Sequence, residues 1–348
     1  MEKTIALIFG GEGAERRISE ISAANVIEKI SGKLDFITVG IDASGSWFLI
    51  NCDKNKIESG EWVNVKNKTP VFPARFHGVS GLYTDKGELI NVDAAFPVLH
   101  GDFGEDGIIQ GALKCAHIPY YGSDVLSSSV SSDKALTKII AEYIGIPTLP
   151  WFIPTSRSAQ DTRREAEKRL GYPFFIKPRR LGSSIGASPV YSKWDFNEAF
   201  ENAMKLSDGQ IMIEAFANVK LELELALFDD GKIRFISKPG TIHSSGKFYS
   251  YSAKYENTDS HETSCDAKLD KGIVRAARSM ARQISDFLQL GNISRIDFFL
   301  TPSNEIYFNE INSVPGMTKT SLYPEITELC GNFSTSVFEK LAYGEPIA

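Results

Sequence analysis

Apolar and polar residues near the N-terminus follow two different periods. Residues 4–9 form a largely apolar run that is typical of a buried strand, and residues 34–41 form a second one. Between them, after glycine-rich residues 10–13, apolar side chains recur at helical spacing: Ile18, Ile21, Ala24, Ile27 and Ile30. The order strand, glycine turn, helix and strand predicts a parallel unit that binds ligands at the carboxyl ends of its strands.

A third apolar run, residues 93–99, leads into a polar, glycine-rich segment and then a helical pattern at residues 108–116. His100 therefore follows a predicted strand, where it either contacts a ligand or serves as a structural hydrogen-bonding group. We expect a new domain to begin near residue 124. Ser132 is expected to cap its first helix, with Lys134 in the first turn, and a cation there indicates a nearby anion.

The middle of the chain contains a candidate phosphate loop. Residues 173–177 and 185–191 are strand-like, and residues 178–184 between them are rich in glycine, serine and arginine. Backbone amides, serine hydroxyls and the ammonium of Lys177 suit a phosphate, although a simple hairpin would have a similar composition. Glu214 and Glu222 stand at the ends of the next strands, as ligand contacts or as solvated strand ends.

Residues 240–271 show little periodicity and are predicted to form a long loop. Phe248, Tyr249, Tyr251 and Tyr255 give the segment an aromatic content that favours a lid over an active site.

Two apolar-rich runs near the C-terminus, residues 294–300 and 306–312, flank a turn-forming segment. If the turn centres on Ser303 and Asn304, the two runs form a hairpin in which residue 297 lies opposite residue 310.

That pairing brings four polar side chains to one sheet face: Arg295, Asp297, Glu310 and Asn312. Two carboxylates opposite each other repel unless a cation lies between them, and their oxygens suit Mg²⁺. The alternative is a solvated strand face that carries mixed charges.

Composition excludes several classes of function. The chain has 348 residues, 42% hydrophobic and 24% charged, which is enough for two or three domains, and its net charge of −6 gives no general attraction for nucleic acid. No apolar stretch approaches the ~18 residues needed to cross a membrane. The four cysteines lie far apart, without zinc-site spacing. We therefore expect a cytoplasmic protein without nucleic-acid or membrane partners.

Short motifs recur in one order from about residue 4 to about residue 340. They are Gly10-Gly11 with Glu15 and Ser19, His100-Gly101 with Gly104-Glu105-Asp106-Gly107, Asp133-Lys134, Lys177-Pro178, Gly182-Ser183-Ser184-Ile185-Gly186, Arg295-Ile296-Asp297, Asn309-Glu310-Ile311-Asn312, Pro315-Gly316-Met317-Thr318 and Ser321-Leu322-Tyr323-Pro324. In this order they resemble the D-alanine–D-alanine ligase family of the ATP-grasp superfamily.

The resemblance implies an α/β (α+β), three-domain ATP-grasp fold. A parallel-sheet N-terminal domain (residues 1–123) would precede a central subdomain with the phosphate loop (124–214) and a C-terminal subdomain with the lid and the Mg²⁺ site (215–348). The nucleotide would lie between two antiparallel sheets, and the protein would form a homodimer.

The family joins two D-alanines to D-alanyl-D-alanine for peptidoglycan precursors. ATP phosphorylates the first D-alanine, and the amine of the second attacks the resulting D-alanyl phosphate. By this resemblance, Lys134 and Lys177 hold the phosphates under the loop that contains Ser184, and Glu214 and Glu222 bind adenine and ribose.

Roles for the remaining site residues are implied in the same way. Two Mg²⁺, or Mn²⁺ in their place, would bind the metal set, which is Asp297, Glu310 and Asn312. Residues around the first D-alanine and its reacting carboxyl would be Glu15, Ser183, Tyr255, Lys254, Arg295 and the Gly316 amide. Further substrate contacts would be His100, Tyr249, Ser321 and the Leu322 amide.

Two points stay open at this stage. One extra residue between Glu214 and Glu222 makes Glu224 an alternative ribose contact. Relatives from vancomycin-resistance clusters use D-serine or D-lactate as the second substrate; Tyr255 argues against D-lactate, and Met317 and Leu322 also follow the D-alanine users.

Other functions compatible with the sequence are a nucleotide sensor that has lost catalysis and an ATP-grasp ligase for another amino acid. The intact polar set, which is Lys177, Arg295, Asp297, Glu310 and Asn312, argues against the sensor.

Overall fold

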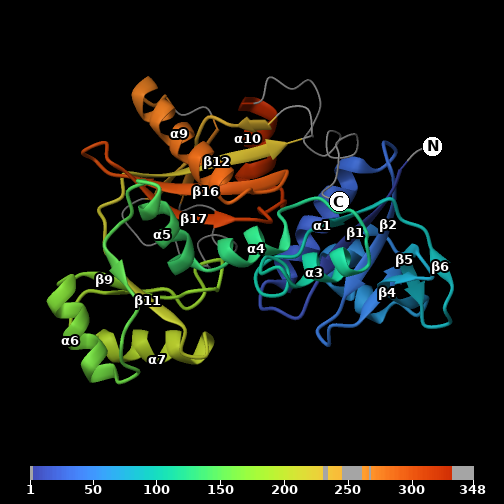
Figure 1. Cartoon of the computed structure of the whole chain (residues 1–348), viewed down its shortest axis with the longest axis horizontal. Helices are drawn as coiled ribbons and strands as arrows, with labels where there is room; N and C mark the ends of the chain where they lie inside the picture. Colours follow the sequence, from blue (N-terminus) through green and yellow to red (C-terminus); the bar gives the residue numbers. More distant parts are fainter. Residues whose placement is uncertain (1–2, 230–233, 245–260, 266–267, 331–348) are drawn as a thin grey trace.

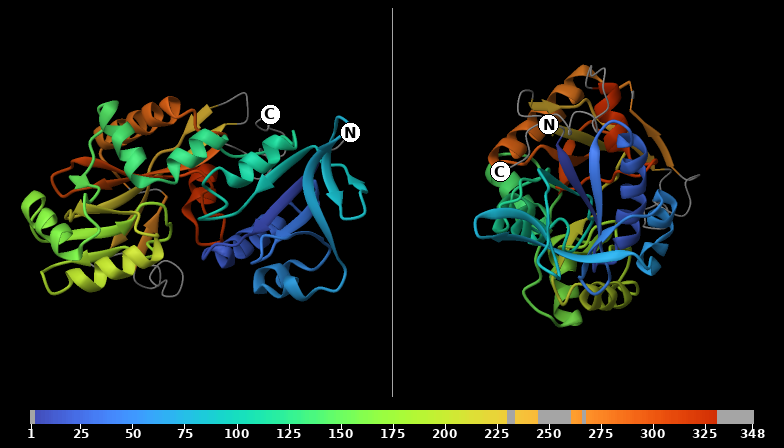
Figure 2. Two further views of the ribbon diagram at one scale, coloured as in Figure 1. Left: turned by 60° about the horizontal axis from the view of Figure 1, so that its bottom comes forward. Right: turned by 90° about the vertical axis from the view of Figure 1, so that its right-hand side faces the viewer.

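The computed structural model describes residues 3–229, 234–244, 261–265 and 268–330, and these residues gather around three β-sheets (Figure 1). The sheets follow one another along the chain. Two views at right angles place the N-terminal sheet beside the other two, which lie one above the other (Figures 1 and 2). The fold is therefore the mixed α/β architecture expected from the sequence.

The N-terminal sheet has the strand order β6-β5-β4-β3-β2-β1-β7. Its strands are β1 (Thr4–Gly10), β2 (Asp35–Ile41), β3 (Trp47–Ile50), β4 (Lys68–Phe76), β5 (Val79–Thr84), β6 (Leu89–Ile90) and β7 (Ala94–Pro97). β1 pairs in parallel with β2 and β7, as the strand, helix and strand pattern predicts, and the remaining pairs are antiparallel. The carboxyl ends of β1 and β7 thus meet at one edge.

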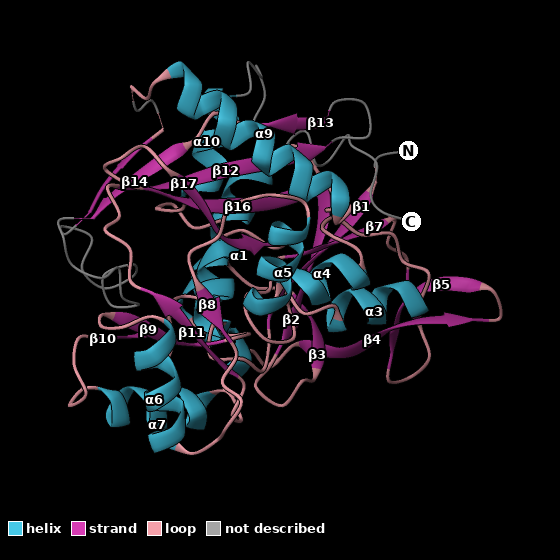
Figure 3. Cartoon of the chain, turned by 60° about the vertical axis from the view of Figure 1, so that its left-hand side comes forward, coloured by secondary structure: helices cyan, strands magenta, loops and turns pink. Residues whose placement is uncertain are grey.

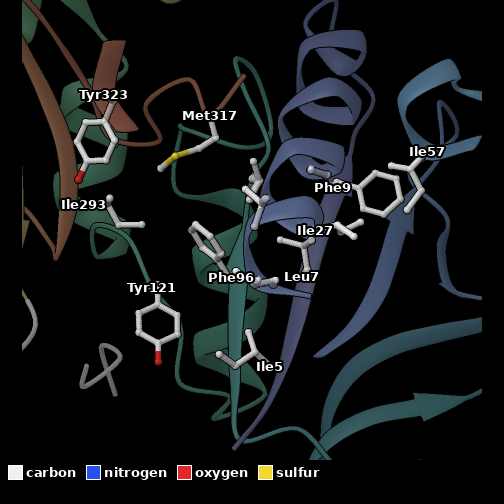
Figure 4. Packing of buried hydrophobic residues seen from close by; sticks show 14 of the residues in the cluster. Ile5, Leu7, Phe9, Ile27, Ile57, Phe96, Tyr121, Ile293, Met317 and Tyr323 are labelled. Carbon is white, nitrogen blue, oxygen red and sulfur yellow. The ribbon is translucent and has the colours of Figure 1, made fainter. Parts of the chain in front are cut away.

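Helices cover this sheet and lead out of it. They are α1 (Arg16–Ile30), α2 (Lys54–Ser59), the 3₁₀ helix η1 (Glu61–Asn64), α3 (Ile108–Cys115) and α4 (Val125–Ser131). The apolar face of α1 packs with β1 and β7, and Met317 and Tyr323 from the C-terminal part join the same buried cluster (Figure 4). This shared core fixes the N-terminal domain against the C-terminal part.

The central sheet has the order β10-β9-β11-β8 and is antiparallel. Its strands are β8 (Trp151–Phe152), β9 (Phe174–Pro178), β10 (Ser188–Val190) and β11 (Ile211–Ala215), and its helices are α6 (Ala159–Arg169) and α7 (Phe196–Leu206). Alternate residues of β9 and β11 pack on these helices, which lie on the side away from the C-terminal sheet (Figure 3). The other face of β9 and β11 points toward that sheet.

The C-terminal sheet is also antiparallel, with the order β15-β14-β12-β16-β17 and β13 beside β12. The strands are β12 (Leu221–Asp229), β13 (Arg234–Ile236), β14 (Gly240–Ser244), β15 (His261–Ser264), β16 (Ile293–Leu300) and β17 (Ile306–Asn312), with α9 (Lys271–Phe287) and α10 (Leu322–Cys330). One face packs on α9 in an apolar core. The opposite face carries the polar side chains of the candidate site.

The predicted hairpin has the expected pairing at the site. Asp297 lies opposite Glu310, and Arg295 lies opposite Asn312. Nearer the turn, however, Phe298 pairs with Phe308, so Asn309 is an extra residue that forms a bulge. Without the bulge, Glu310 would alternate onto the face that packs on α9 instead of the polar face.

Three predicted elements need correction. The predicted loop at residues 240–271 contains two paired strands, β14 and β15, because β14 adds to the edge of β12. The strand predicted at 185–191 is only β10, since Gly186 turns the chain with a positive φ of 72°. Asp133, not Ser132, caps α5 (Lys134–Tyr143), because its carboxylate accepts from the amides of the first turn.

No helix in the described part of the chain combines the length and the apolar character that a membrane crossing requires.

Candidate active site

Two adjoining clefts lie between the sheets, and together they contain most of the predicted site residues. A cleft of about 810 Å³ is lined by the predicted amino-acid contacts, which are Glu15, His100, Ser183, Gly316, Ser321 and Leu322. A second cleft of about 650 Å³ is lined by the predicted nucleotide contacts Lys134, Lys177, Ser184 and Glu222, and by Asp297. Arg295 and Glu310 line both clefts. Glu224 lines both as well, so the two sets of residues meet at these three side chains.

The phosphate loop between β9 and β10 is anchored to the start of α5. The backbone amide of Lys134 donates to the Arg179 carbonyl (3.0 Å), and its ammonium donates to the Leu181 carbonyl (2.8 Å). The Asp133 carboxylate, which is fully buried, accepts from Arg179 Nε (3.1 Å) and Nη2 (2.6 Å). These contacts hold the loop against a helix N-terminus, where an anion is favoured.

The loop also reaches the N-terminal domain. Ser183, in a left-handed conformation with φ of 50°, donates its hydroxyl to the Glu15 carboxylate at the start of α1. A Cβ on Gly182 would lie 2.9 and 3.0 Å from the two Glu15 oxygens, so any other residue here would displace the Glu15 carboxylate. Burial raises the pKa of Glu15, and the nearby Glu105 carboxylate raises it further. An ammonium group beside Glu15 would relieve both effects.

His100 lies in the amino-acid cleft, but both ring nitrogens have protein partners. Nδ1 donates to the Val314 carbonyl (3.1 Å), Nε2 accepts from Ser22 Oγ (3.0 Å), and Glu105 Oε1 is 3.6 Å from Nδ1. Its role in this state is to hold the segment after β17 against α1.

Arg295 is central to the polar face of β16. Its guanidinium binds Asp297 through Nε (2.8 Å) and Nη2 (2.7 Å), and it lies 3.4 Å from Glu224 on β12. Asn312 Nδ2 also donates to Asp297 (3.0 Å). Although burial opposes its charge, the carboxylates of Asp297 and Glu224 raise the pKa of Arg295 well above its ordinary value.

The predicted metal set is only a partial ligand shell. Lys134 Nζ lies 3.1 Å from Glu310 Oε2, so both acidic members have cationic partners in this state. Among the described residues, no group of three or more His, Cys, Asp or Glu side chains gathers as a metal site. Two carboxylates and an amide nevertheless fit Mg²⁺, which keeps waters and binds substrate phosphates.

Gly316, Ser321 and Leu322 lie where α10 begins. Ser321 Oγ accepts from the Thr318 amide (3.1 Å), and a Cβ on Gly316 would lie 2.7 Å from the same oxygen. The Leu322 amide belongs to the first turn of α10, whose N–H groups favour an anion.

Glu214 lines neither cleft. Its carboxylate is 1% exposed and lies between Lys138 Nζ and Lys177 Nζ, each 2.5 Å away. Its predicted contact with adenine stays a prediction.

Tyr249, Lys254 and Tyr255 lie outside the described residues. The sequence assigns no role to Glu105 and Asp133, which occur there only as members of motifs, and Lys138 was missed. Asp133 had a recognisable signal, because aspartate is a preferred capping residue. Lys138 falls on the buried face of α5 with Ala135 and Ala141, which is an unusual place for a lysine.

Comparison with known proteins agrees with this geometry. Residues 4–123 match the family model described as D-ala D-ala ligase N-terminus, and residues 140–342 match D-ala D-ala ligase C-terminus. A D-alanine–D-alanine ligase from Clostridium acetobutylicum is 34% identical over 98% of this chain and 97% of its own length. One from Treponema denticola is 36% identical over 94% of this chain and 90% of its own length.

Solved structures are similar over nearly the whole chain. The VanG D-Ala:D-Ser ligase from Enterococcus faecalis superposes with a TM-score of 0.85 at 34% identity, covering 98% of both chains. The D-alanine–D-alanine ligase from Coxiella burnetii has a TM-score of 0.82 at 26% identity, covering 98% of this chain and 94% of its own. With two family models, full-length relatives and the same fold, the chain belongs to the D-alanine–D-alanine ligase family.

Proposed function

We propose that this chain joins two D-alanines to D-alanyl-D-alanine at the expense of ATP, through a D-alanyl phosphate, for peptidoglycan precursor synthesis. The observation that carries the proposal is the meeting of an amino-acid cleft and a nucleotide cleft at Glu224, Arg295 and Glu310. A phosphoryl group can pass between substrates only where the two binding sites touch, and its transfer depends on positioning and charge neutralisation.

The nucleotide side uses the cations around the phosphate loop. Lys134 and Lys177 neutralise the phosphates, and the Ser184 hydroxyl and backbone of the loop cover them. Glu222, which lines the nucleotide cleft on β12, binds the ribose. Glu224, its neighbour on the same face, also lines this cleft, but its carboxylate pairs with Arg295, which supports Glu222 for this role.

Asp297, Glu310 and the Asn312 amide oxygen would hold two Mg²⁺, or Mn²⁺ in their place. When bound there, the ions would supply neutralisation of the phosphate charge. Asp297 now accepts from Arg295 and Asn312, so Arg295 must shift and the Asn312 amide must rotate to present its oxygen.

The amino-acid side follows the polar groups of the first cleft. Glu15, oriented by Ser183, binds the ammonium of the first D-alanine, and His100 keeps the cleft wall in place. Arg295, released from Asp297, and the Gly316 amide stabilise the tetrahedral oxyanion. Ser321 and the Leu322 amide bind the carboxylate of the second D-alanine at the helix start. From sequence resemblance, Tyr249, Lys254 and Tyr255 complete the site.

A second candidate is a D-alanine–D-serine ligase, because the similar VanG structure carries that description. The two are separated by phosphate release from D-alanine alone and from equal concentrations of D-alanine with D-serine or D-lactate, near neutral pH. The proposal expects full turnover with D-alanine alone; mixed products dominating in the competition would overturn it.

The same experiment addresses a nucleotide sensor. ADP formation that depends on D-alanine supports the ligase, whereas tight ATP binding without amino-acid-dependent turnover would support the sensor.

We further propose that the protein acts in the cytoplasm as a homodimer. One supporting observation is an exposed apolar stripe on α5, formed by Leu136, Ile139 and Tyr143 at 38%, 49% and 80% exposure. Light scattering on the purified full chain should give twice the 38.4 kDa chain mass; a monomer at micromolar concentration would contradict the assembly.

A further inference from the structure

Lys138 is a buried lysine for which the proposed chemistry has no role. It lies on α5, and its side chain is 1% exposed. Its ammonium lies 2.5 Å from Glu214 Oε1 and donates to the Phe308 carbonyl on β17 (3.3 Å). Lysine is almost never fully buried unless it is paired, so the contacts around it identify its purpose.

Glu214 connects Lys138 to the nucleotide cleft. Residues 177 on β9 and 214 on β11 are diagonal neighbours on one sheet face, because Lys177 pairs with Met212 and Phe175 pairs with Glu214. One Glu214 oxygen contacts Lys138, and the other accepts from Lys177 (2.5 Å). The carboxylate is thus shared by two ammonium groups, one deep and one facing the cleft.

The electrostatics of this trio follow from its burial. Burial alone would raise the pKa of Glu214, but the ammonium groups of Lys138 and Lys177 lower it to about 2. Burial also lowers the pKa of Lys138, which the adjacent carboxylate opposes. With Glu214 ionised and both lysines paired to it, the trio carries one net positive charge. Lys177 is its most exposed member, at 14% against 1% for the other two.

We propose that Lys138 is a positioning residue for the nucleotide phosphates, which compensates Glu214 so that the positive charge of Lys177 remains available to the substrate. This inference rests on the proposed function, because it assumes that Lys177 faces a nucleotide phosphate. Without Lys138, Glu214 and Lys177 would form a neutral pair. The cleft would then lose one positive charge without losing any residue that lines it.

A purely structural role predicts something different. Lys138 also ties α5 to β11 and β17, so its removal could weaken binding simply by loosening these elements. The two roles separate when Glu214 is neutralised as well. In the double variant Lys138→Met/Glu214→Gln, the charge count returns to one positive charge on Lys177, but the structural tie stays broken.

The test is calorimetric titration of ADP into the purified full chain in buffer with EDTA, with melting temperatures measured in parallel. We expect Lys138→Met to weaken ADP binding about tenfold or more, the effect of losing one charge-assisted contact. We expect Lys138→Met/Glu214→Gln to bind ADP at least about threefold more tightly than Lys138→Met, because the positive charge of Lys177 is restored. Ala141→Gly, a neutral change on the same buried helix face, is the matched control: it should lower the melting temperature and leave the Kd unchanged.

Three outcomes would overturn the inference. They are unchanged binding by Lys138→Met, a double variant that binds as weakly as the single variant, and weakening by Ala141→Gly that matches Lys138→Met. If Lys138→Met does not fold, the double variant decides, because it contains no unpaired carboxylate; a Kd for inorganic pyrophosphate, which has no adenine for Glu214 to contact, more than about tenfold above the wild type contradicts the charge argument. Failure of the wild type to bind ADP in a parallel titration with Mg²⁺ would instead contradict the proposed function.

Discussion

Asp133 has two roles, capping α5 and holding the phosphate loop through Arg179, and one substitution separates them. Asp133→Asn keeps a side-chain oxygen that can accept from the Ala135 and Leu136 amides, and asparagine caps helices about as well as aspartate. What the substitution removes is the negative charge that holds Arg179. The change therefore releases the loop while leaving the start of α5 intact.

The size of the effect follows from the burial of the pair. Removing one partner of a buried ion pair costs about 3–5 kcal/mol, because the other charge is left uncompensated. Asp133 is fully buried, but the Arg179 side chain is 19% exposed and regains some water, so we expect about 2 kcal/mol. An unfolding entropy of ~2.1 cal/mol/K per residue gives ~1.4 °C per kcal/mol for 348 residues, so the melting temperature should fall by about 3 °C. A loosened loop should also raise the KM for ATP about tenfold.

Thermal unfolding and steady-state ADP formation test this expectation. Arg180→Ala is the matched control, because Arg180 touches the same carboxylate only at 3.4 Å and is 54% exposed. It should change stability by less than about 1 kcal/mol. Arg179→Leu should reproduce the Asp133→Asn effect, and the double variant should be less than additive. The reasoning fails if Asp133→Asn leaves the KM for ATP within about twofold while Arg179→Leu raises it.

Three further substitutions test other parts of the site. Glu15→Gln should raise the melting temperature of the ligand-free protein at about pH 8 but not at about pH 4. Burial and Glu105 raise the pKa of Glu15 above its ordinary value of 4.5. The stability that Glu15 contributes is therefore present below pH 4.5 and is lost as the pH rises through the raised pKa. An equal change in melting temperature at both pH values would contradict this pH dependence. Gly182→Ala should raise the KM for D-alanine about 5–30-fold, with little change in the KM for ATP, because the added methyl group crowds Glu15; initial rates measure both, and the reverse pattern would be inconsistent with the clash. Arg295→Lys should lower kcat about 100-fold or more, with ADP affinity kept within about threefold, since it removes an oxyanion donor; a kcat within tenfold of the wild type would exclude that role.

The pairing of the hairpin at the site was predicted correctly, but the bulge that produces this pairing was not. The register at Asp297 and Glu310 follows from a turn centred on Ser303 and Asn304, but the structure reaches it through the bulge at Asn309. The apolar positions Ile306, Phe308 and Ile311 contain the signal, because strict alternation would put an apolar residue at 310. A bulge is visible in sequence only as such a break in period.

Two errors have tertiary causes. Ser132 and Asp133 are both good capping residues, and the choice of Asp133 depends on Arg179, which lies 46 positions away. The strands β14 and β15 have weak strand propensity in sequence, since Gly240, Ser244 and Ser264 break the pattern. They form because β12 offers an edge for pairing, which no local pattern reveals.

The contacts of Lys138 could be predicted from the sequence only in part. Its place on the buried face of α5 could be read from the sequence, because Ala135 and Ala141 define that face. Its partner could not be predicted, because Glu214 lies on β11. The two residues meet only because α5 packs between β11 and β17.

The central claim is that this site activates one D-alanine with ATP and couples it to another. The direct measurement is mass spectrometry of the products after incubation with ATP, Mg²⁺ and D-alanine, with ADP measured in the same sample. The account predicts one D-alanyl-D-alanine for each ADP, and no dipeptide from L-alanine. ADP formed without dipeptide, or dipeptide formed equally well from L-alanine, would contradict it.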